Sequence, residues 1–390
     1  MKTKVMIIFG GRSVEHEVSV ISGIQAYNNM DTDAFDVIPV YLSKENVLYV
    51  GEDTGRIEAY RDIEGLIKRS QRSILVNEGG RVKLVPYPKK AFGRSLEYEI
   101  DVVLPVLHGT NVEDGAFQGY LKTLGVPFAG CDVLASALGM DKYHMKAVLK
   151  EAGIPLLDAL NFTLSDYEDI EGIIGKTEEK YGYPVIVKPV NTGSSVGIKV
   201  AGSRGELINA IDEGYKYSSR ILIEKAITNL REINCAVLGD ENQAEASECE
   251  EPLHSDEILS YKDKYQSNEK GGGSKGMAGV KRRIPADIPD ELRTRVRDLA
   301  VRAFKALCCA GVSRIDFLLD GDTGELYFNE INTIPGSLSF YLFEPIGVSY
   351  KELLTRLIEL ALKRDRTEKS LTFTFDTNIL STSALGGSKK

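Results

Sequence analysis

Two carboxylates near position 320 are spaced so that they could bind a divalent metal ion. Apolar segments at 313–319 and 325–332 flank turn-forming residues, and this pattern predicts a β-hairpin. Antiparallel pairing about the turn places Asp316 opposite Glu330. Two facing carboxylates among apolar residues would repel each other, and burying both would be costly unless a cation lay between them. The hairpin therefore predicts a metal site.

Two further polar residues belong to the same predicted face. The pairing places Arg314 opposite Asn332, and the two-residue period of a strand aligns both with Asp316 and Glu330. Carboxylate and amide oxygens are the ligands that Mg²⁺ prefers, together with water and substrate phosphates. We therefore expect Asp316, Glu330 and Asn332 to bind magnesium. A surface ion pair between Arg314 and Asp316 is the alternative interpretation, but the apolar flanking residues indicate a buried sheet.

A second candidate site follows a predicted strand at 184–188. Lys188 begins the segment Lys-Pro-Val-Asn-Thr-Gly-Ser-Ser-Val-Gly, which matches neither the P-loop nor the dinucleotide-binding pattern of glycines. Backbone N–H groups next to glycine, the hydroxyls of Ser194 and Ser195 and a lysine are nevertheless groups that bind a polyphosphate. An ordinary hairpin loop would give a similar pattern.

A third candidate site lies at the end of another strand. Glu224 and Lys225 follow the apolar residues Ile221 to Ile223, and Glu232 comes shortly after them. These groups could bind an adenine amino group and ribose hydroxyls. Charged residues at the end of a strand are more often only solvated, so the residue types alone leave both interpretations open.

The elements that must position these residues divide the chain into three predicted domains. Residues 1–138 begin with a buried strand, a glycine turn and a helix, which is typical of a doubly wound α/β unit. Residues 139–227 predict a compact α+β lobe, and residues 228–365 predict the lobe that contains the hairpin. The stretch from about 50 to 95 is polar and is expected to be an irregular elaboration of the first domain.

Two segments are expected to lie outside this framework. The loop 253–279 is long for a compact domain and contains Gly271 to Gly276, so it is expected to be a lid or a binding loop. The amphipathic helix 350–364 is expected to end the ordered chain, and 366–390 to be a disordered tail.

Composition excludes several classes of protein. The 390 residues carry a net charge of −9, which argues against DNA or RNA as a partner. Apolar runs are of strand length, far below a membrane span, so no membrane partner is expected. Five cysteines and four histidines show no zinc spacing and predict buried thiols. The chain is expected to be cytoplasmic.

Taken in order, the motifs resemble those of the D-alanine–D-alanine ligase family, which includes the D-alanine–D-serine ligases of vancomycin resistance. The resemblance covers nearly all of residues 1–364. It implies an ATP-grasp fold that follows an N-terminal doubly wound domain in the sequence. The fold class of the chain is therefore expected to be α/β and α+β. The resemblance also implies synthesis of D-alanyl-D-alanine for peptidoglycan through D-alanyl phosphate, with ATP and two Mg²⁺ or Mn²⁺. The segments that carry it are Gly10–Ser19, His108–Gly115, Met140–Lys142, Lys188–Gly197, Glu224–Lys225, Arg314–Asp316 and Asn329–Gly336.

The resemblance further implies roles for individual residues. Glu15 would bind the ammonium group of the first D-alanine, and His108 would lie near its carboxylate. Ser194 and the lid residue Tyr265 would complete the network of Glu15. The groups implied to stabilise the oxyanion are Arg314 and the backbone N–H of Gly336; those implied to bind ATP are Lys142, Lys188, Ser195, Glu224, Lys225, Ala226, Ile227 and Glu232; the implied metal ligands are Asp316, Glu330 and Asn332.

Two positions depart from the family pattern. Val112 stands where a glycine is common, and Tyr341 occupies the position of a serine that normally binds the carboxylate of the second substrate, next to the backbone of Leu342. A phenol could donate a hydrogen bond from a different distance. D-serine and, less so, D-lactate are therefore open as second substrates, whereas the intact Lys264-Tyr265 pair favours D-alanine.

Other interpretations stay open beside this one. They are an ATP-grasp carboxylate–amine ligase with other substrates, a nucleotide-binding regulatory protein without catalysis, and a purely structural protein. The paired carboxylates of the hairpin and the retained Arg314 disfavour the last two. Small-molecule substrates and a homodimer are expected.

Overall fold

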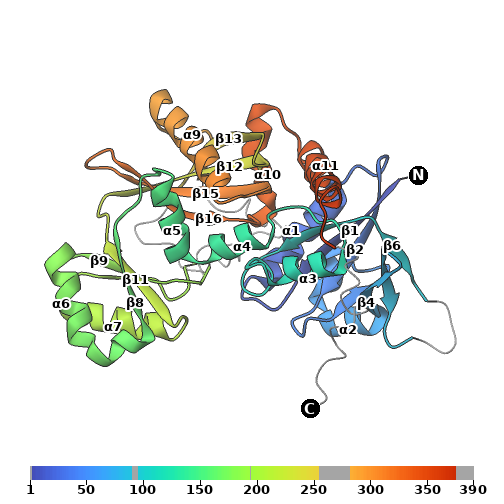
Figure 1. Cartoon of the computed structure of the whole chain (residues 1–390), viewed down its shortest axis with the longest axis horizontal. Coiled ribbons are helices and arrows are strands. Elements are labelled where there is room, and N and C mark those ends of the chain that lie inside the picture. Colours follow the sequence, from blue (N-terminus) through green and yellow to red (C-terminus); the bar gives the residue numbers. More distant parts are fainter. Residues whose placement is uncertain (1, 90–94, 194, 254–281, 375–390) are drawn as a thin grey trace, which may run out of the picture.

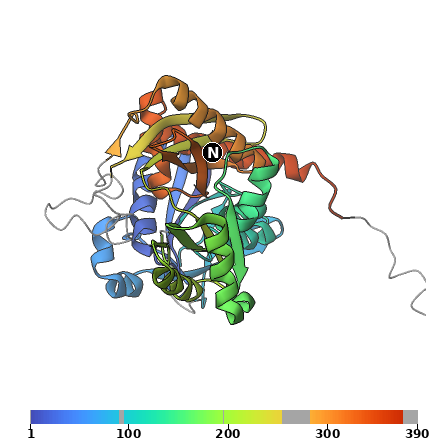
Figure 2. The same ribbon diagram turned by 90° about the vertical axis from the view of Figure 1, so that its left-hand side faces the viewer.

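The computed structural model describes residues 2–89, 95–193, 195–253 and 282–374. Ser194, Tyr265 and the predicted lid beyond Leu253 lie outside the described residues. Three β-sheets form the framework, and each sheet is built from one continuous part of the chain (Figure 1). Both views place the sheet that contains β12 and β15 above the lobe that contains α6 and α7 (Figures 1 and 2).

The N-terminal sheet has seven strands in the order β6-β5-β4-β3-β2-β1-β7. Strand β1 lies between β2 and β7 and is parallel to both. Helices α1 (His16–Asn29) and α11 (Tyr350–Lys369) pack on one face, and α3 (Ala116–Leu124) packs on the other. This arrangement is the doubly wound unit that the sequence predicts. The strands are β1 (Thr3–Gly10), β2 (Phe35–Leu42), β3 (Leu48–Val50), β4 (Gln71–Glu78), β5 (Arg81–Pro86), β6 (Tyr98–Ile100) and β7 (Val102–Leu107).

The prediction of an irregular stretch between 50 and 95 is wrong. This part of the chain contains the short helix α2 (Ile63–Arg69) and the antiparallel strands β4 and β5, which extend the sheet. Val82 and Leu84 of β5 are buried, and the residues between them alternate to the other face. Only one side of these strands faces the core, so their composition is polar although their structure is regular.

The central sheet has four strands in the order β10-β9-β11-β8. Helices α6 (Ile170–Tyr181) and α7 (Arg204–Tyr215) cover one face and share a hydrophobic core with it (Figure 1). Helices α4 (Val133–Met140) and α5 (Lys142–Glu151) lead into this lobe from the N-terminal sheet. The strands are β8 (Ala159–Thr163), β9 (Val185–Pro189), β10 (Lys199–Ala201) and β11 (Arg220–Lys225).

The C-terminal sheet has five strands in the order β14-β13-β12-β15-β16. Its hairpin, β15 (Gly311–Asp320) and β16 (Leu326–Asn332), pairs Asp316 with Glu330 and Arg314 with Asn332, so the predicted register is confirmed. A bulge between Asp316 and Phe317 shifts the pairing beyond this point by one residue. The other strands are β12 (Leu230–Gly239), β13 (Ala244–Pro252) and β14 (Arg282–Arg283).

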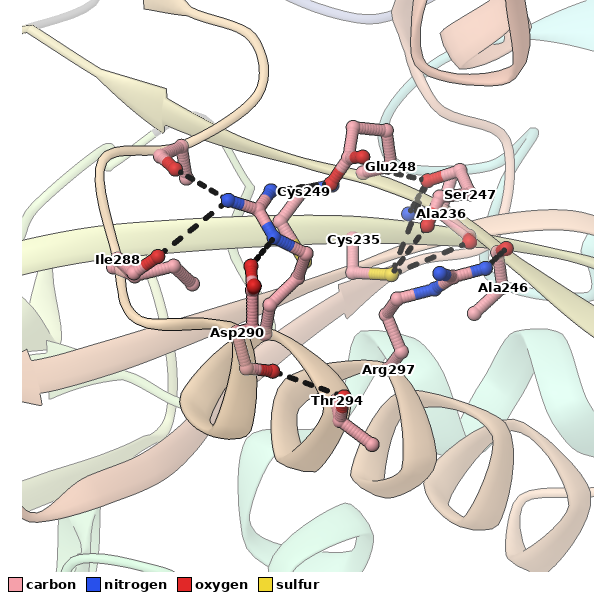
Figure 3. A network of polar contacts seen from close by, with 12 residues as sticks. Cys235, Ala236, Ala246, Ser247, Glu248, Cys249, Ile288, Asp290, Thr294 and Arg297 are labelled. Atoms are coloured by element: carbon pink, nitrogen blue, oxygen red, sulfur yellow. Dashed lines mark hydrogen bonds and ion pairs between the residues drawn. The ribbon is translucent and has the colours of Figure 1, made fainter. Parts of the chain in front are cut away.

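Helix α9 (Asp290–Ala306) covers the back of this sheet (Figure 3). Arg297 of the helix donates a hydrogen bond to the carbonyl of Ala246 at 3.0 Å, and the fully buried Cys235 lies beneath the helix. Apolar residues of α9, including Phe304, share a core with Ile315 and Phe328 of the hairpin. Because α9 takes the back face, the polar residues of β12, β15 and β16 are left on the opposite face.

Helix α11 runs from Tyr350 to Lys369, so the predicted helix end at 364 and the predicted start of the tail at 366 are wrong. The apolar periodicity stops near Ala361, but an ion pair of 2.8 Å between Asp365 and Lys369 continues the helix. Residues 375–390 lie outside the described residues. Within the described ranges, no helix is both long enough and apolar enough to cross a membrane.

Gly10, at the end of β1, is expected to tolerate no side chain. Its φ is +102°, and an added Cβ would lie 2.2 Å from the carbonyl oxygen of Leu42. We expect Gly10→Ala to lower the free energy of unfolding by about 2 kcal/mol or more, as measured by urea denaturation. Gly175→Ala is the control, because that glycine lies within α6 with no atom within 4 Å of the added Cβ. Equal stability of the two variants would contradict this prediction.

Candidate active site

A cavity of about 620 Å³ lies where the three sheets meet. The N-terminal domain contributes Glu15 and His108, the central sheet contributes Lys188, and the C-terminal sheet contributes Arg314 and Asp316. The structure thus brings together the three candidate sites that the sequence places far apart.

The first wall of the cavity is the carboxyl edge of the N-terminal sheet. Glu15 precedes α1, which follows β1, and His108 directly follows β7. Since β1 and β7 are parallel neighbours, both residues lie at the same edge, where open α/β sheets bind their ligands. The carboxylate of Glu15 lies close to Gly109, since a Cβ added there would be 3.0 Å from its Oε2.

His108 connects this edge to the segment that follows β16. Its Nδ1 lies 2.8 Å from the carbonyl oxygen of Ile334, which can only accept, so Nδ1 carries the proton. Its Nε2 accepts from the hydroxyl of Ser22 at 3.3 Å, and that oxygen accepts the backbone N–H of Ser337 at 2.9 Å. Burial lowers the pKa of His108 to about 4, so the ring is neutral at pH 7 and positions the segment around Gly336.

The second wall is a row of polar residues across the C-terminal sheet. Strand pairing places Glu250 beside Asn234, Asn234 beside Asp316, and Asp316 beside Glu330. All four residues line the cavity. Each of the four neighbouring strands therefore contributes one residue to the row, which consists of three carboxylates and the amide of Asn234.

Arg314 neutralises the centre of this row. Its Nε and Nη2 donate to the two carboxylate oxygens of Asp316 at 2.7 and 2.6 Å, and Asn332 donates to Oδ2 of Asp316 at 3.1 Å. Burial raises the pKa of Asp316, Arg314 opposes this, and Glu330 reinforces it. The ion pair proposed as the alternative interpretation exists, but it is buried and lies within the cavity instead of on the surface.

The donor set of this row suits a hard divalent cation. Asp316 and Glu330 face each other directly, and the amide oxygen of Asn332 becomes available if the side-chain amide rotates. Among the described residues, no group of three or more His, Cys, Asp or Glu side chains could hold a metal. Two facing carboxylates and one amide oxygen are donors that suit Mg²⁺, which takes its remaining ligands from water and phosphates.

The third wall carries a cluster of lysines. Lys146 and Lys188 pair with the two carboxylate oxygens of Glu224 at 2.7 and 2.8 Å, and Lys142 donates to the carbonyl of Thr192 at 2.6 Å. Burial lowers the pKa of Lys142, while Glu330 opposes this effect. Three ammonium groups around one carboxylate leave a net positive charge, which suits a polyphosphate.

The structure places Glu224 behind the lysine cluster. Its side chain is fully buried, does not line the cavity, and holds Lys146 and Lys188 from behind. Burial raises the pKa of its carboxyl, but Lys188 and Lys146 lower it more, to about 2. Its carboxylate faces the two lysines, and the implied contact with adenine stays a prediction. The other described residues implied to bind ATP do line the cavity, namely Lys142, Lys188, Ser195, Lys225, Ala226, Ile227 and Glu232.

Tyr341 and Leu342 are not among the lining residues of the cavity. Leu342 is fully buried in a hydrophobic core. Tyr341 lies behind Arg282, whose guanidinium stacks on the phenol ring at 4.2 Å, and its hydroxyl donates to Glu250 at 3.4 Å. Gly336, implied to offer its backbone N–H, does line the cavity.

Sequence reasoning missed several residues of the site. Lys146 lies one helical turn after Lys142 on α5, a spacing that could have indicated it. Glu113 lies within the motif 108–115, and it accepts the backbone N–H groups of Ile334 at 2.9 Å and Gly109 at 3.1 Å. Burial and repulsion from Glu15 raise the pKa of Glu113 to about 8. The other missed residues are Asn234, Glu250 and Arg282, which no local pattern marks.

Comparisons with known proteins find similar sequences over most of the chain. Family models described as "D-ala D-ala ligase N-terminus" and "D-ala D-ala ligase C-terminus" match residues 4–131 and 148–359. A D-alanine–D-alanine ligase of Acetivibrio thermocellus is 43% identical over 375 residues, which cover 93% of this chain and 96% of the relative.

Solved structures give the same match. The VanG D-Ala:D-Ser ligase from Enterococcus faecalis superposes with a TM-score of 0.76 at 30% identity, covering 93% of this chain and all of that one. The D-alanine–D-alanine ligase from Coxiella burnetii superposes with a TM-score of 0.78 at 27% identity, covering 95% and 96% of the two chains.

Proposed function

We infer the reaction of this chain from its membership of the D-alanine–D-alanine ligase family, whose ATP-grasp fold it has. It is an ATP-dependent ligase that joins two D-alanine molecules into the dipeptide used in peptidoglycan, with release of ADP and phosphate. The observation that carries this conclusion is the single cavity in which the lysine cluster, the acidic row and the edge with Glu15 and His108 meet.

We propose that the ATP phosphates lie against the lysine cluster. Lys142 and Lys188 reach the cavity from two different elements, and Ser195 lies on the loop beside them. The backbone of residues 225–227 and the carboxylate of Glu232 would then bind the adenine and the ribose. The γ-phosphate would then lie between the lysines and the acidic row, because both line the same cavity.

Asp316, Glu330 and Asn332 would hold Mg²⁺ at this point. Bound there, the metal ions would neutralise the charge that develops on the phosphoryl oxygens. The two lysines spread the same charge from the opposite side of the cavity. Arg314 remains beside the carboxylates and keeps the row from accumulating unbalanced negative charge.

The two steps of the reaction then use the remaining residues. Glu15 binds the ammonium group of the first D-alanine, whose carboxylate attacks the γ-phosphorus in line and becomes an acyl phosphate. The uncharged amine of the second D-alanine attacks the acyl carbon, and phosphate leaves. Arg314 and the backbone N–H of Gly336 face the oxyanion of this second step. His108 acts as a positioning residue, since both of its ring nitrogens hold the chain around Gly336.

A D-alanine–D-serine ligase is the second candidate. The structural match to the D-Ala:D-Ser ligase from Enterococcus faecalis at 30% identity favours it, as does Tyr341 at the position where the family pattern has serine. We also propose that the enzyme acts in the cytoplasm as a homodimer. Its five free thiols and its use of ATP support the compartment, and light scattering would test the dimer.

Phosphate release tests the proposed function directly. We expect release from MgATP to rise many-fold on addition of D-alanine, with D-alanyl-D-alanine as the main product by mass spectrometry. Parallel reactions contain D-alanine with D-serine or with D-lactate, and L-alanine is the control. A larger amount of D-alanyl-D-serine than of the alanine dipeptide would favour the second candidate. No stimulation by any D-amino acid would refute the ligase assignment.

A further inference from the structure

Four residues at the β13 end of the polar row form a cluster that the reaction described above does not use. The Nη1 of Arg282 pairs with Oε2 of Glu250 at 3.3 Å, and the guanidinium stacks on the ring of Tyr341 at 4.2 Å. Oε1 of Glu250 accepts from the Nδ2 of Asn234 at 3.1 Å and from the hydroxyl of Tyr341 at 3.4 Å. Arg282, Glu250 and Asn234 all line the cavity.

The substrates of the proposed reaction place a charge requirement on the cavity. The carboxylate of the donor amino acid is consumed by phosphorylation, whereas that of the acceptor stays ionised throughout. An ionised carboxylate inside a cavity requires a cationic or strongly donating partner. The acceptor position therefore requires a cationic side chain or strong hydrogen-bond donors away from the phosphates, and Tyr341 replaces the serine that the family pattern has there.

The cationic residues of the described cavity wall differ in what they can offer this carboxylate. Lys142 and Lys188 belong to the phosphate end, and Nζ of Lys225 is held by the carbonyls of Tyr181 and Tyr183 at 3.0 and 2.8 Å. Arg314 gives Nε and Nη2 to Asp316. Arg282 lies apart from the lysines, on the opposite side of the polar row from Glu330.

The surroundings of Arg282 hold its guanidinium in place at the cavity wall. Its side chain is only 13% exposed, the ring of Tyr341 supports its flat face, and Glu250 holds one of its nitrogens. A planar fork held in this way matches a carboxylate bidentately, which an ammonium group cannot do. In a water-poor site such a pair is strong.

Asn234 provides an independent indication that a polar ligand group binds here. This residue is 4% exposed, and its Oδ1 has no hydrogen-bond partner among the described residues, while its Nδ2 faces Glu250. A buried acceptor without a partner costs about 1–3 kcal/mol. An N–H donor from a ligand in the cavity would remove that cost, and the amine of an amino acid supplies one.

We propose that Arg282 binds the carboxylate of the acceptor amino acid and that Oδ1 of Asn234 accepts a hydrogen bond from its amine. This inference rests on the proposed ligase function. Tyr341 then acts as a positioning residue beneath Arg282, which accounts for an aromatic residue where the family pattern has a serine. The acceptor site would thus bind both the carboxylate and the amine of an α-amino acid.

Competition between two acceptors tests this assignment. D-Alaninamide has no carboxylate, so it cannot be phosphorylated and can react only as the acceptor. With saturating MgATP and equimolar D-alanine and D-alaninamide, mass spectrometry gives the ratio of D-alanyl-D-alanine to D-alanyl-D-alaninamide. This ratio reports the acceptor step alone, because both products share the same donor and the same nucleotide.

We expect Arg282→Gln to lower this ratio by about 10-fold to 100-fold, since it removes a charged hydrogen-bonding partner of the carboxylate. Arg283→Gln is the matched control. Arg283 is the next residue of β14, pairs with Glu251 and Asp287, and does not line the cavity, so its ratio should stay at the wild-type value. Arg282→Lys keeps the charge without the planar fork and should lower the ratio several-fold.

The outcomes distinguish a failure of the ligase function from a failure of the assignment of Arg282. A wild-type protein that makes neither product refutes the ligase function. A wild-type protein that makes the dipeptide, with an unchanged ratio in Arg282→Gln, overturns the assignment of Arg282. If Arg282→Gln does not fold, the ratio of Arg282→Lys decides, and a wild-type ratio there overturns the assignment as well.

Discussion

The Glu330→Gln variant is expected to lose about 10³-fold of the ligase turnover while its free energy of unfolding stays within about 1 kcal/mol of wild type. Glu330 lies opposite Asp316 and lines the cavity. Among the described residues, no hydrogen bond or ion pair holds its carboxylate. Its charge favours the charged form of the buried Lys142 but repels Asp316, so the two effects of its removal oppose each other.

Asp316→Asn should behave differently, although both residues are proposed as metal ligands. Asp316 is the bidentate partner of the buried Arg314, so its neutralisation should cost about 3 kcal/mol of stability as well as the turnover. Phosphate release and urea denaturation measure the two effects separately. Glu325→Gln is the control, because Glu325 is exposed and lies just before β16. It should change neither turnover nor stability. Wild-type turnover of Glu330→Gln would contradict the metal assignment.

Glu224→Gln should be among the most destabilising single substitutions in the chain. Glu224 is fully buried and pairs with Lys146 and Lys188, so the substitution leaves two buried ammonium groups without their counter-charge. The expected loss is about 3–5 kcal/mol in the free energy of unfolding. Urea denaturation at pH 7 measures it. Glu171→Gln, which removes an exposed partner of Arg204, should change stability by less than about 0.5 kcal/mol.

The same carboxylate should contribute to the acid sensitivity of the protein. The pKa of Glu224 is lowered from 4.5 to about 2 in the folded state, so the unfolded state binds the proton first as the pH falls. Its stabilisation, about 3 kcal/mol, is fully present above pH 4.5 and is lost as the pH falls towards 2. Glu224→Gln lacks this contribution, so its stability should fall less steeply over that range. Parallel curves for the two proteins would contradict the assignment.

The register of the hairpin could be predicted because its determinants are local. The turn at Asp320 to Gly324 and the two alternating strands place Asp316 within one residue of Glu330, and the bulge after Asp316 brings the two residues opposite each other. The bulge after Asp316 was not predictable, since it depends on how Phe317 and Phe328 pack against the core under α9. The proposed metal ligands therefore lie beyond the bulge from the turn, where the pairing matches the predicted register.

Residues whose partners are distant in the sequence could not be found in this way. Glu224 pairs with Lys146, 78 positions earlier, and Glu113 accepts from the backbone of Ile334, 221 positions later. The role proposed for Arg282 depends on its contacts with Tyr341 and Glu250, which belong to other elements. Their side-chain types gave no signal, because a charged residue in a polar segment is normally solvated.

The continuity of each sheet in the sequence has a consequence for synthesis on the ribosome. The strands of the three sheets occupy residues 3–107, 159–225 and 230–332, and no sheet shares a strand with another. A nascent chain can therefore complete each sheet from one continuous stretch, although β1 pairs with β7, and β12 with β15, only after the later strand has emerged. The cavity, in contrast, is complete only after β16 and Gly336 have left the exit tunnel. Nucleotide binding through all three walls is thus a property that the chain acquires last, when nearly all of it has been translated.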